Sequence, residues 1–404
     1  MDATRRMVLS AAATVATTAA TGPVFAQNAA PAAPAADAPK PNLPIVTAPG
    51  YDAPSEVKSI FVRNLAALEE QAKKIVPNGG FGYISSGAGD EWTMHENMHA
   101  FKRVQLLPTY LEGNGAPDSK TSLLGIDIPV PIITTVFGGH AIAHVTAEAG
   151  TAYGTHAAGT IFTCGSQSNL TMEEVAKASP GPNFMQLYIQ NDAGLMREFV
   201  QRARAAGYKA IVVTMDAFFR SNRETDLANH YSSPFQAVNF PKRAETGYNA
   251  SSQVMKTTVD WKDIEFVQKE SGLPVIVKGV LTEQMALDAV KQGCAGIQVS
   301  NHGGRQLDDT PATFTVLPEI ADAVGGRIPI ILDSGVRRGQ DVYKALAMGA
   351  NVIALGRPVL YGLALGGWMG VRDVHHKIAD EFRMTMMATG TKKISEITRD
   401  RLRV

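Results

Sequence analysis

A histidine and an arginine stand three residues apart in the segment 300–309, which reads SNHGGRQLDD. The segment follows a stretch in which the apolar residues Ile297 and Val299 alternate with other residues, so it should begin at the carboxyl end of a short strand. The imidazole of His302 can act as a general base, and the guanidinium of Arg305 can hold a carboxylate through two N–H groups. Either residue alone would more often be structural. Together they indicate chemistry on a small carboxylate.

The chain after Pro129 alternates eight short apolar runs with helical, alanine-rich segments. Alternating strands and helices predict a parallel sheet, and eight such units close a (β/α)8 TIM barrel. An open doubly wound sheet is the alternative, but no G-x-G-x-x-G dinucleotide fingerprint follows the first run. The predicted strands span residues 130–136, 160–164, 184–189, 210–216, 274–278, 296–300, 328–333 and 352–356.

Two further elements are predicted around this barrel. Apolar residues at helical spacing, with Ser55 as a candidate cap, predict an N-terminal helix over residues 55–74. The connection between the fourth and fifth runs, residues 217–260, is too long for a plain βα loop and helix, and we expect a lid over the barrel mouth. A disordered surface insertion is the alternative for this segment.

The beginning of the chain differs in character from the rest. An arginine pair in the segment TRRMVL precedes a mildly apolar stretch and a small-residue cleavage pattern that ends at Ala26. This order resembles a twin-arginine export signal, so residues 1–26 are predicted to be a signal peptide that sends the folded protein to the periplasm. A disordered basic tail is the alternative. Residues 27–53 are predicted to be an Ala/Pro-rich linker, and residues 54–404 the barrel domain.

Composition limits the classes of partner. Lys plus Arg and Asp plus Glu both number 38, so no overall charge favours nucleic acid or an anionic membrane. The two cysteines, Cys164 and Cys294, lack the neighbours of a zinc site, and we expect no metal. No strongly apolar run reaches 18 residues, so membrane insertion is not expected.

Polar residues recur at the carboxyl ends of six consecutive predicted strands, the end of a β/α barrel where reactive residues lie. Each of them alone could be structural, but a barrel without a site would have little reason to bury so many polar groups at one mouth. The last two loops, DSGVRRG and LGRP, combine glycine amides with arginines where such barrels hold a phosphate. The strand-end residues are Gln186, Tyr188, Thr214, Asp216, Lys278, Ser300, His302, Arg305, Asp333, Gly335, Arg337, Gly356 and Arg357.

The segments SNHGGRQLD, DSGVRRGQDVYKALAMGA and ALGRPVLYGLALGG resemble the FMN-dependent α-hydroxy acid oxidase and dehydrogenase family. The segment YISSGAGDEWT, residues 83–93, is most similar to the L-lactate oxidase branch of that family. The resemblance covers nearly the whole folded chain and implies FMN as cofactor. It also implies oxidation of an L-2-hydroxy acid to the 2-keto acid.

The resemblance assigns a role to each candidate residue. It implies that His302 is the catalytic base, that Asp216 pairs with the imidazolium, and that Lys278 and Tyr188 complete the catalytic set. Substrate binding would fall to Tyr83, Arg305, Arg223 and Tyr188. The cofactor would be held by Gln186, Thr214, Lys278 and Ser300, and its phosphate by Arg337, Gly356 and Arg357 together with the loop that carries Asp333 and Gly335.

Two segments depart from the family pattern. Residues 134–139 read TTVFGG where the family usually has Ala-Pro and a small residue, and Gly165 begins a second change. The resemblance to the lactate oxidase branch favours L-lactate as substrate, whereas the room left by these departures makes a bulkier acid such as mandelate the alternative. The acceptor is expected to be oxygen, giving hydrogen peroxide, or else a quinone or soluble carrier. An isomerase and a noncatalytic exported flavin-binding protein are weaker alternatives, and the resemblance implies a homotetramer.

Overall fold

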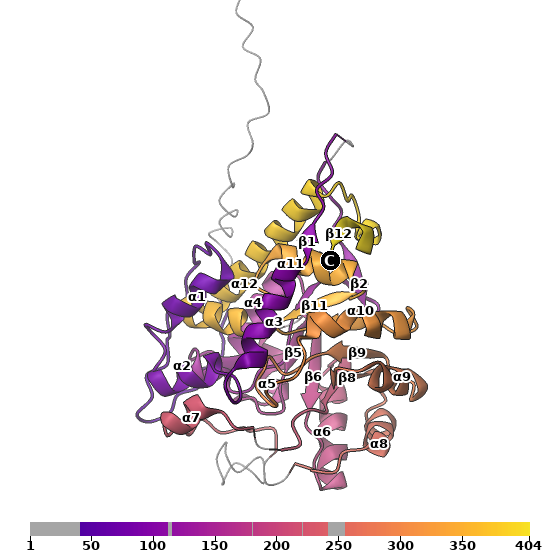
Figure 1. Cartoon of the computed structure of the whole chain (residues 1–404). Coiled ribbons are helices and arrows are strands. Elements are labelled where there is room, and N and C mark those ends of the chain that lie inside the picture. Colours follow the sequence, from indigo (N-terminus) through magenta and orange to yellow (C-terminus); the bar gives the residue numbers. More distant parts are fainter. Residues whose placement is uncertain (1–40, 112–114, 180, 220, 241–254) are drawn as a thin grey trace, which may run out of the picture. The chain divides into compact units, whose positions relative to one another are not determined.

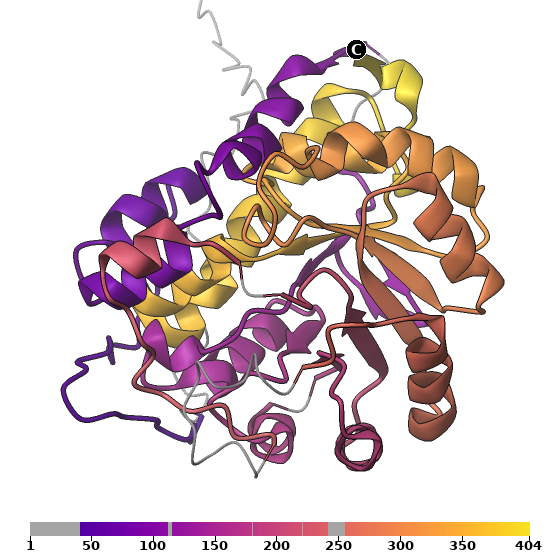
Figure 2. The same cartoon turned by 60° about the horizontal axis from the view of Figure 1, so that its bottom comes forward.

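The computed structural model describes residues 41–111, 115–179, 181–219, 221–240 and 255–404. Within 42–404, eight parallel strands close into a barrel in the order β10-β11-β4-β5-β6-β7-β8-β9, with helices packed around them (Figures 1 and 2). The predicted (β/α)8 TIM barrel is confirmed, and each predicted run overlaps one strand. The barrel strands are β4 (Ile132–Thr134), β5 (Phe162–Cys164), β6 (Asn183–Leu187), β7 (Ala210–Thr214), β8 (Val275–Val280), β9 (Gly296–Val299), β10 (Ile330–Leu332) and β11 (Val352–Leu355).

Each barrel strand is followed by a helix that covers the outside of the barrel. These helices are α4 (Ala147–Ala157), α5 (Met172–Ala178), α6 (Ala193–Ala205), α8 (Trp261–Ser271), α9 (Glu283–Lys291), α10 (Thr313–Val324), α11 (Gly339–Ala347) and α12 (Arg357–Ala388). The other elements are α1 (Leu65–Ala72), α2 (Asn78–Ser85), α3 (Trp92–Arg103), α7 (Glu224–Ala228), the antiparallel pair β1 (Gln105–Leu106) and β12 (Leu402–Arg403), and the hairpin β2 (Thr121–Leu123) and β3 (Ile126–Ile128). None of the helices in these ranges is long and apolar enough to cross a membrane.

The strands are apolar along their length because both of their faces are buried, as in other parallel sheets. Residues such as Phe184 and Val212 form a cluster inside the barrel, which Leu123 and Ile128 of the β2–β3 hairpin complete. A larger cluster fills the space between the strands and the outer helices. The hairpin therefore closes one end of the barrel with apolar side chains, whereas the carboxyl ends of the strands stay polar.

The predicted helix over residues 55–74 is wrong for its first half. The helix α1 begins only at Leu65, where the Asn64 side chain accepts a hydrogen bond from the Ala67 N–H at 2.8 Å. The preceding segment runs along α12, because the Ile60 N–H and the Ser59 hydroxyl both donate to Asp373, at 2.8 and 2.7 Å. These hydrogen bonds to α12 replace the backbone hydrogen bonds that a helix would form here.

Two other segments differ in part from their predictions. Residues 42–53, placed in the linker by the sequence, contact the barrel: the Val46 N–H donates to the Val145 carbonyl, and the Tyr51 hydroxyl donates to the Ile142 carbonyl. In the insertion 217–260, the short helix α7 packs near α2. Residue 220 and residues 241–254 of the predicted lid, and the predicted signal peptide, lie outside the described residues.

Candidate active site

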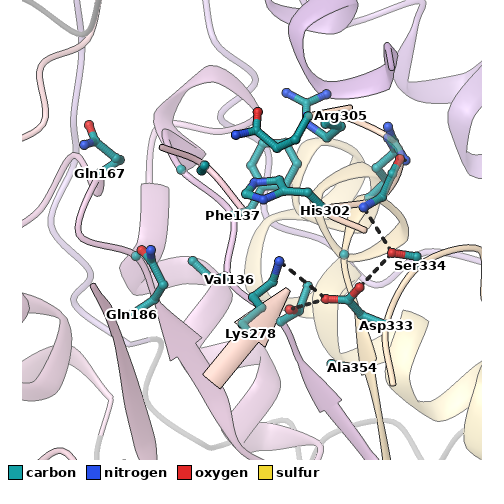
Figure 3. Close-up of a pocket in the computed structure, with 18 of the residues that line it drawn as sticks. Val136, Phe137, Gln167, Gln186, Lys278, His302, Arg305, Asp333, Ser334 and Ala354 are labelled. Atoms are coloured by element: carbon teal, nitrogen blue, oxygen red, sulfur yellow. Dashed lines mark hydrogen bonds and ion pairs between the residues drawn. The ribbon is translucent and has the colours of Figure 1, made fainter. Parts of the chain in front are cut away.

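A pocket at the carboxyl ends of the barrel strands brings most of the predicted site residues together (Figure 3). Its empty volume is about 1400 Å³, including its open mouth. The predicted residues that line it are Tyr83, Gln186, Tyr188, Arg223, Lys278, His302, Arg305, Asp333, Gly335, Arg337, Gly356 and Arg357. The other three, Asp216, Thr214 and Ser300, lie behind the lining and are hydrogen-bonded to His302, Gln186 and Lys278.

His302 and Asp216 form a hydrogen-bonded pair, with 2.9 Å between Nδ1 of the imidazole and Oδ1 of the carboxylate. Burial lowers the pKa of His302, and the charge of Lys278 lowers it further, while Asp216 acts in the opposite direction. For Asp216, burial alone would raise the pKa, but the charges of His302 and Lys278 outweigh it, and the pKa is lowered. At neutral pH the pair is therefore a neutral imidazole beside an ionised carboxylate, which is the form that can accept a proton.

The loop that carries His302 is held in an uncommon backbone conformation. His302 has a φ of 59° and Ser334, on the next loop, has a φ of 78°, both in the left-handed region that side chains disfavour. The hydroxyl of Ser300 accepts the His302 N–H at 3.1 Å, and the hydroxyl of Ser334 accepts the Gly303 N–H at 3.0 Å. Such strain persists where the surroundings hold it, and it is concentrated at functional sites.

Two guanidinium groups lie against the ring of Tyr83. Arg305 lies 5.1 Å and Arg223 lies 5.2 Å from the ring centroid, and Arg305 also lies 5.4 Å from the centroid of Phe137. Arg305 is buried and donates to the Ser86 carbonyl at 2.7 Å, which fixes its direction. This cluster presents two positive charges and a phenol to the pocket, a set that suits a carboxylate.

Lys278 is almost fully buried, with 2% of the residue exposed. Its ammonium group donates to the Ser300 hydroxyl at 2.9 Å. The same group lies 3.9 Å from the Asp333 carboxylate (Figure 3). Asp333 in turn accepts hydrogen bonds from Gln298 at 2.6 Å and from Ser334 at 2.7 Å. The network fixes a positive charge at the floor of the pocket, where low polarity strengthens its effect.

On strand β6, the side-chain amide of Gln186 is held by hydrogen bonds through both its nitrogen and its oxygen. Its Nε2 donates to the Thr214 hydroxyl of β7 at 3.0 Å, and its Oε1 accepts from the Ser166 N–H and hydroxyl at 3.1 and 3.2 Å. All three residues are buried. The amide therefore has one defined orientation at the pocket wall.

The far end of the pocket lies at the amino termini of α11 and α12, where the helix dipoles favour an anion. Gly335 has a φ of 85°, and a Cβ added there would lie 2.2 Å from the Asn97 carbonyl oxygen, so the loop requires glycine. Burial lowers the pKa of Arg357 to about 9, and the charge of Arg305 adds to the effect. In the described part of the chain, no carboxylate pairs with Arg337 or Arg357.

Several lining residues were not among the predicted site residues. Ser334 lines the pocket and donates to Asp333, and Gln298 donates to the same carboxylate from behind the lining. Met255 and Ser221 reach the pocket from the insertion, and Gln306 reaches it from the His302 loop. A glutamine inside an apolar run was the available signal for Gln298. The loop residues Val136, Phe137, Gly138, Gly165 and Gln167 also line the pocket. The sequence marked their segments only as departures from a family pattern.

Comparison with known proteins identifies the family. The model of the FMN-dependent dehydrogenase family matches residues 72–404. This chain belongs to that family. Its cofactor is FMN, and it is a flavin-dependent oxidase of 2-hydroxy acids, as the resemblance in the sequence implied.

Characterised relatives cover nearly all of the barrel domain. An L-lactate oxidase of Streptococcus iniae is 42% identical over 353 residues, which are 85% of this chain and 87% of the relative. Glycolate oxidase 3 of Arabidopsis thaliana is 40% identical over 353 residues, 85% of this chain and 96% of the relative. The family therefore contains oxidases with different substrates at similar distances from this chain.

Solved structures give the same fold. A crystal structure of a Pediococcus acidilactici protein described as a lactate oxidase has a TM-score of 0.84 at 40% identity, covering 88% of this chain and 98% of its own. A mandelate oxidase with (S)-2-phenylpropionate has a TM-score of 0.78 at 32% identity, covering 85% and 98%. The eight-stranded barrel and its surrounding helices are thus shared.

The residues of the pocket fit FMN. Arg337 and Arg357, without carboxylate partners in the described chain, stand beside two helix amino termini and suit the phosphate. Gly335 keeps the loop beside them in a conformation that no side chain allows. Lys278 supplies a buried positive charge that suits an electron-rich ring. In the described ranges, no group of three or more His, Cys, Asp or Glu side chains could hold a metal ion.

Proposed function

We propose that this enzyme oxidises L-lactate to pyruvate and passes the electrons to oxygen, forming hydrogen peroxide. The observation that carries the proposal is the position of the His302–Asp216 pair in the same pocket as Arg305, Arg223 and Tyr83. A base and a carboxylate-binding cluster are what a 2-hydroxy acid requires. The lactate oxidase relatives support the choice of a small acid.

In this proposal the carboxylate-binding cluster, made of Arg305, Arg223 and Tyr83, orients the substrate. Arg305 and Tyr83 hold the carboxylate, and Arg223, which also lies against the Tyr83 ring, adds a second positive charge. Burial raises the pKa of Tyr188 well above its ordinary value, so its hydroxyl stays protonated and can donate to the substrate oxygen. The α-carbon is thereby placed next to His302.

His302 then takes a proton from the substrate. Its Nδ1 is bound to Asp216, so Nε2 is the nitrogen left to accept that proton. The carboxylate of Asp216 stabilises the imidazolium that forms and keeps the ring in one orientation. Oxidation removes two electrons and two protons from the hydroxy acid in total.

The bound FMN would supply the two-electron acceptor. Its ring would be held by Gln186 and Lys278, which Thr214 and Ser300 support from behind. Its phosphate would be held by Gly335, Arg337, Gly356 and Arg357, with Asp333 fixing the loop between them. The guanidinium of Arg357 already donates to the carbonyls of Ile84, Ser86 and Gly303, so it would act on the phosphate mainly through its charge.

A bulkier acid such as mandelate is the second candidate, because Phe137, Phe219 and Met255 give the pocket an apolar wall. The mandelate oxidase structure supports this alternative. A quinone or soluble carrier is the second candidate for the electron acceptor, since Phe218 and Phe219 are exposed beside the mouth.

Steady-state turnover with L-lactate, glycolate and (S)-mandelate, with hydrogen peroxide measured in parallel, tests both choices. We expect the highest kcat/KM for L-lactate and one peroxide per acid oxidised. A higher kcat/KM for (S)-mandelate would overturn the substrate assignment. Turnover that requires an added quinone, without peroxide, would overturn oxygen as the acceptor.

We also propose that the protein is exported, folded and with its cofactor loaded, to the periplasm by the signal in residues 1–26, and that it works as a homotetramer. The arginine pair and cleavage pattern support export. Fractionation of cells that express the full chain, compared with an Arg5→Lys and Arg6→Lys double variant, tests the route. Light scattering of the purified protein tests the tetramer, and a monomeric mass would contradict it.

A further inference from the structure

We propose that Glu148, which lies outside the pocket, positions the pocket wall formed by the loops after β4 and β5. This role rests on the proposed function, because the wall is argued to serve substrate binding. Glu148 is in the first turn of α4 and is fully buried. In the described chain, no lysine, arginine or histidine side chain forms an ion pair with it. An unpaired buried carboxylate is costly and needs a reason.

The carboxylate binds three backbone N–H groups, and these come from two different loops. Its Oε1 accepts from His140 at 3.1 Å and from Asn169 at 3.1 Å, and its Oε2 accepts from Leu170 at 3.3 Å. His140 belongs to the loop after β4, whereas Asn169 and Leu170 belong to the loop after β5. One side chain therefore fixes the spacing between the two loops.

Other bonds between the two loops depend on the same spacing. The Gly139 N–H donates to the Gln167 carbonyl at 3.2 Å, and the Ala141 N–H donates to the Asn169 side chain at 3.0 Å. A Cβ at Gly165 would lie 3.0 Å from the Phe137 carbonyl oxygen, so the loops also touch. A shift of either loop would disturb all of these contacts together.

The loops carry one wall of the pocket. Val136, Phe137 and Gly138 line it from the first loop, and Gly165 and Gln167 line it from the second. Figure 3 draws Phe137 close to Arg305, and the Phe137 ring also meets the Tyr83 ring edge-on at 6.2 Å. The connection from Glu148 to the carboxylate-binding cluster therefore runs through Phe137.

The backbone next to Glu148 is held in an uncommon conformation. Ala147 has a φ of 47°, which is uncommon for a residue with a side chain. Burial raises the pKa of Glu148 to about 7, and the three N–H groups oppose that rise. The neighbouring titratable groups His140, Cys164 and Tyr208 have pKa values shifted toward their neutral forms, so they do not neutralise the carboxylate.

Glu148→Gln tests the proposal, because it keeps the size of the side chain but replaces one acceptor oxygen by a donor NH2 group. Glu174→Gln is the matched control: Glu174 also accepts a backbone N–H, from Thr171, but it is exposed at the cap of α5. In the holoenzyme, hydrogen exchange of peptides covering 137–143 and 165–170 should accelerate about tenfold or more in the first variant and remain unchanged in the control. Unchanged exchange in Glu148→Gln would overturn the proposal.

Kinetics separate this role from a general loss of structure. Because Glu148 acts on the carboxylate-binding cluster and not on His302, the KM for L-lactate should rise about tenfold while kcat changes less than about threefold. In a double-mutant cycle that combines Glu148→Gln with Phe137→Leu, the rise in KM should be smaller than the product of the two single-variant rises, since both substitutions act through the Phe137 side chain. A fall in kcat as large as the rise in KM would contradict this role. Effects of the two substitutions on KM that multiply independently would contradict the path through Phe137.

If Glu148→Gln does not fold, Glu148→Asp provides the same test. It keeps the charge but is one methylene shorter, so it cannot reach both loops, and the same two peptides should exchange faster. The proposed substrate is tested separately by the wild-type enzyme. Failure to oxidise L-lactate overturns the substrate, whereas unchanged exchange in the variants overturns the role of Glu148.

Discussion

The two ends of the barrel are built from opposite chemistry. At the hairpin end, Leu123 and Ile128 close the interior with apolar side chains that have no polar partners to satisfy. At the other end, Lys278, Asp333 and Gln298 are buried polar groups that depend on one another, and His302 is in a strained backbone conformation. Packing is thus concentrated at one end, and charge and strain at the other, so substitutions at the two ends should have separable effects.

The largest effect on activity is expected from Asp216→Asn. The amide cannot stabilise the imidazolium, so kcat/KM should fall by about 100-fold or more. The carboxylate also raises the pKa of His302, so its loss lowers that pKa, and the acid limb of the pH–rate profile should move to lower pH. A profile of kcat/KM against pH for both proteins measures the two effects. An acid limb that moves to higher pH would contradict the pairing.

At the hairpin end, Leu123→Ala should reduce stability and leave the chemistry intact. Leu123 is 1% exposed, and the cavity left by its side chain should cost about 2–5 kcal/mol of unfolding free energy. Denaturant unfolding of the holoenzyme measures the loss, and kcat should stay within about twofold of wild type. Ser122→Ala, exposed in the same hairpin, is the control. A large fall in kcat would show that the two ends are not independent.

Arg305→Lys should weaken substrate binding more than turnover. Lysine cannot form the bidentate hydrogen bonds of a guanidinium with a carboxylate, and it loses the cation–π contacts with the Tyr83 and Phe137 rings. We expect the KM for L-lactate to rise by about tenfold or more, with a smaller change in kcat. Steady-state kinetics across substrate concentrations separate the two constants, and an unchanged KM would remove Arg305 from the carboxylate-binding cluster.

The smallest effect is expected from Ser334→Ala. The variant leaves the Gly303 N–H without its acceptor and removes one hydrogen bond to Asp333, a cost of about 1–3 kcal/mol. The dissociation constant of the flavin, measured by fluorescence, should rise several-fold, while the pH dependence of kcat stays the same. A variant that holds its flavin as tightly as wild type would show that the Ser334 bonds do not support the cofactor site.

The sequence predicted the barrel because parallel strands buried on both faces leave a signal of short apolar runs. Most of the predicted strand-end residues line the pocket, since topology brings the carboxyl ends of all eight strands together, whereas Asp216, Thr214 and Ser300 lie behind the lining. The first half of the helix predicted over 55–74 was wrong because its apolar spacing is helical but the Ser59 hydroxyl and the Ile60 N–H bind Asp373, far away in the sequence. Local periodicity contains no information about such a partner.

The supporting residues of the site were harder to predict for a similar reason. Ser334 and Glu148 act through contacts that depend on loop geometry, and neither residue type is unusual at its position in the sequence. Met255 reaches the pocket from a distant insertion. By contrast, His302 and Arg305 share one short segment, so their joint role could be inferred from the sequence alone. Sequence reasoning therefore named most of the candidate site residues, and it missed Ser334 and Glu148, which bind to the loops around them.

The most direct test of the account is the anaerobic visible spectrum of the holoenzyme before and after addition of L-lactate, recorded for wild type and for His302→Ala. The account predicts that the flavin band of the wild type bleaches within the mixing time. It predicts that the variant keeps its bound flavin but bleaches at least about 100-fold more slowly. Equally rapid bleaching in the variant would contradict His302 as the base, and a wild-type band that persists would contradict L-lactate as the substrate.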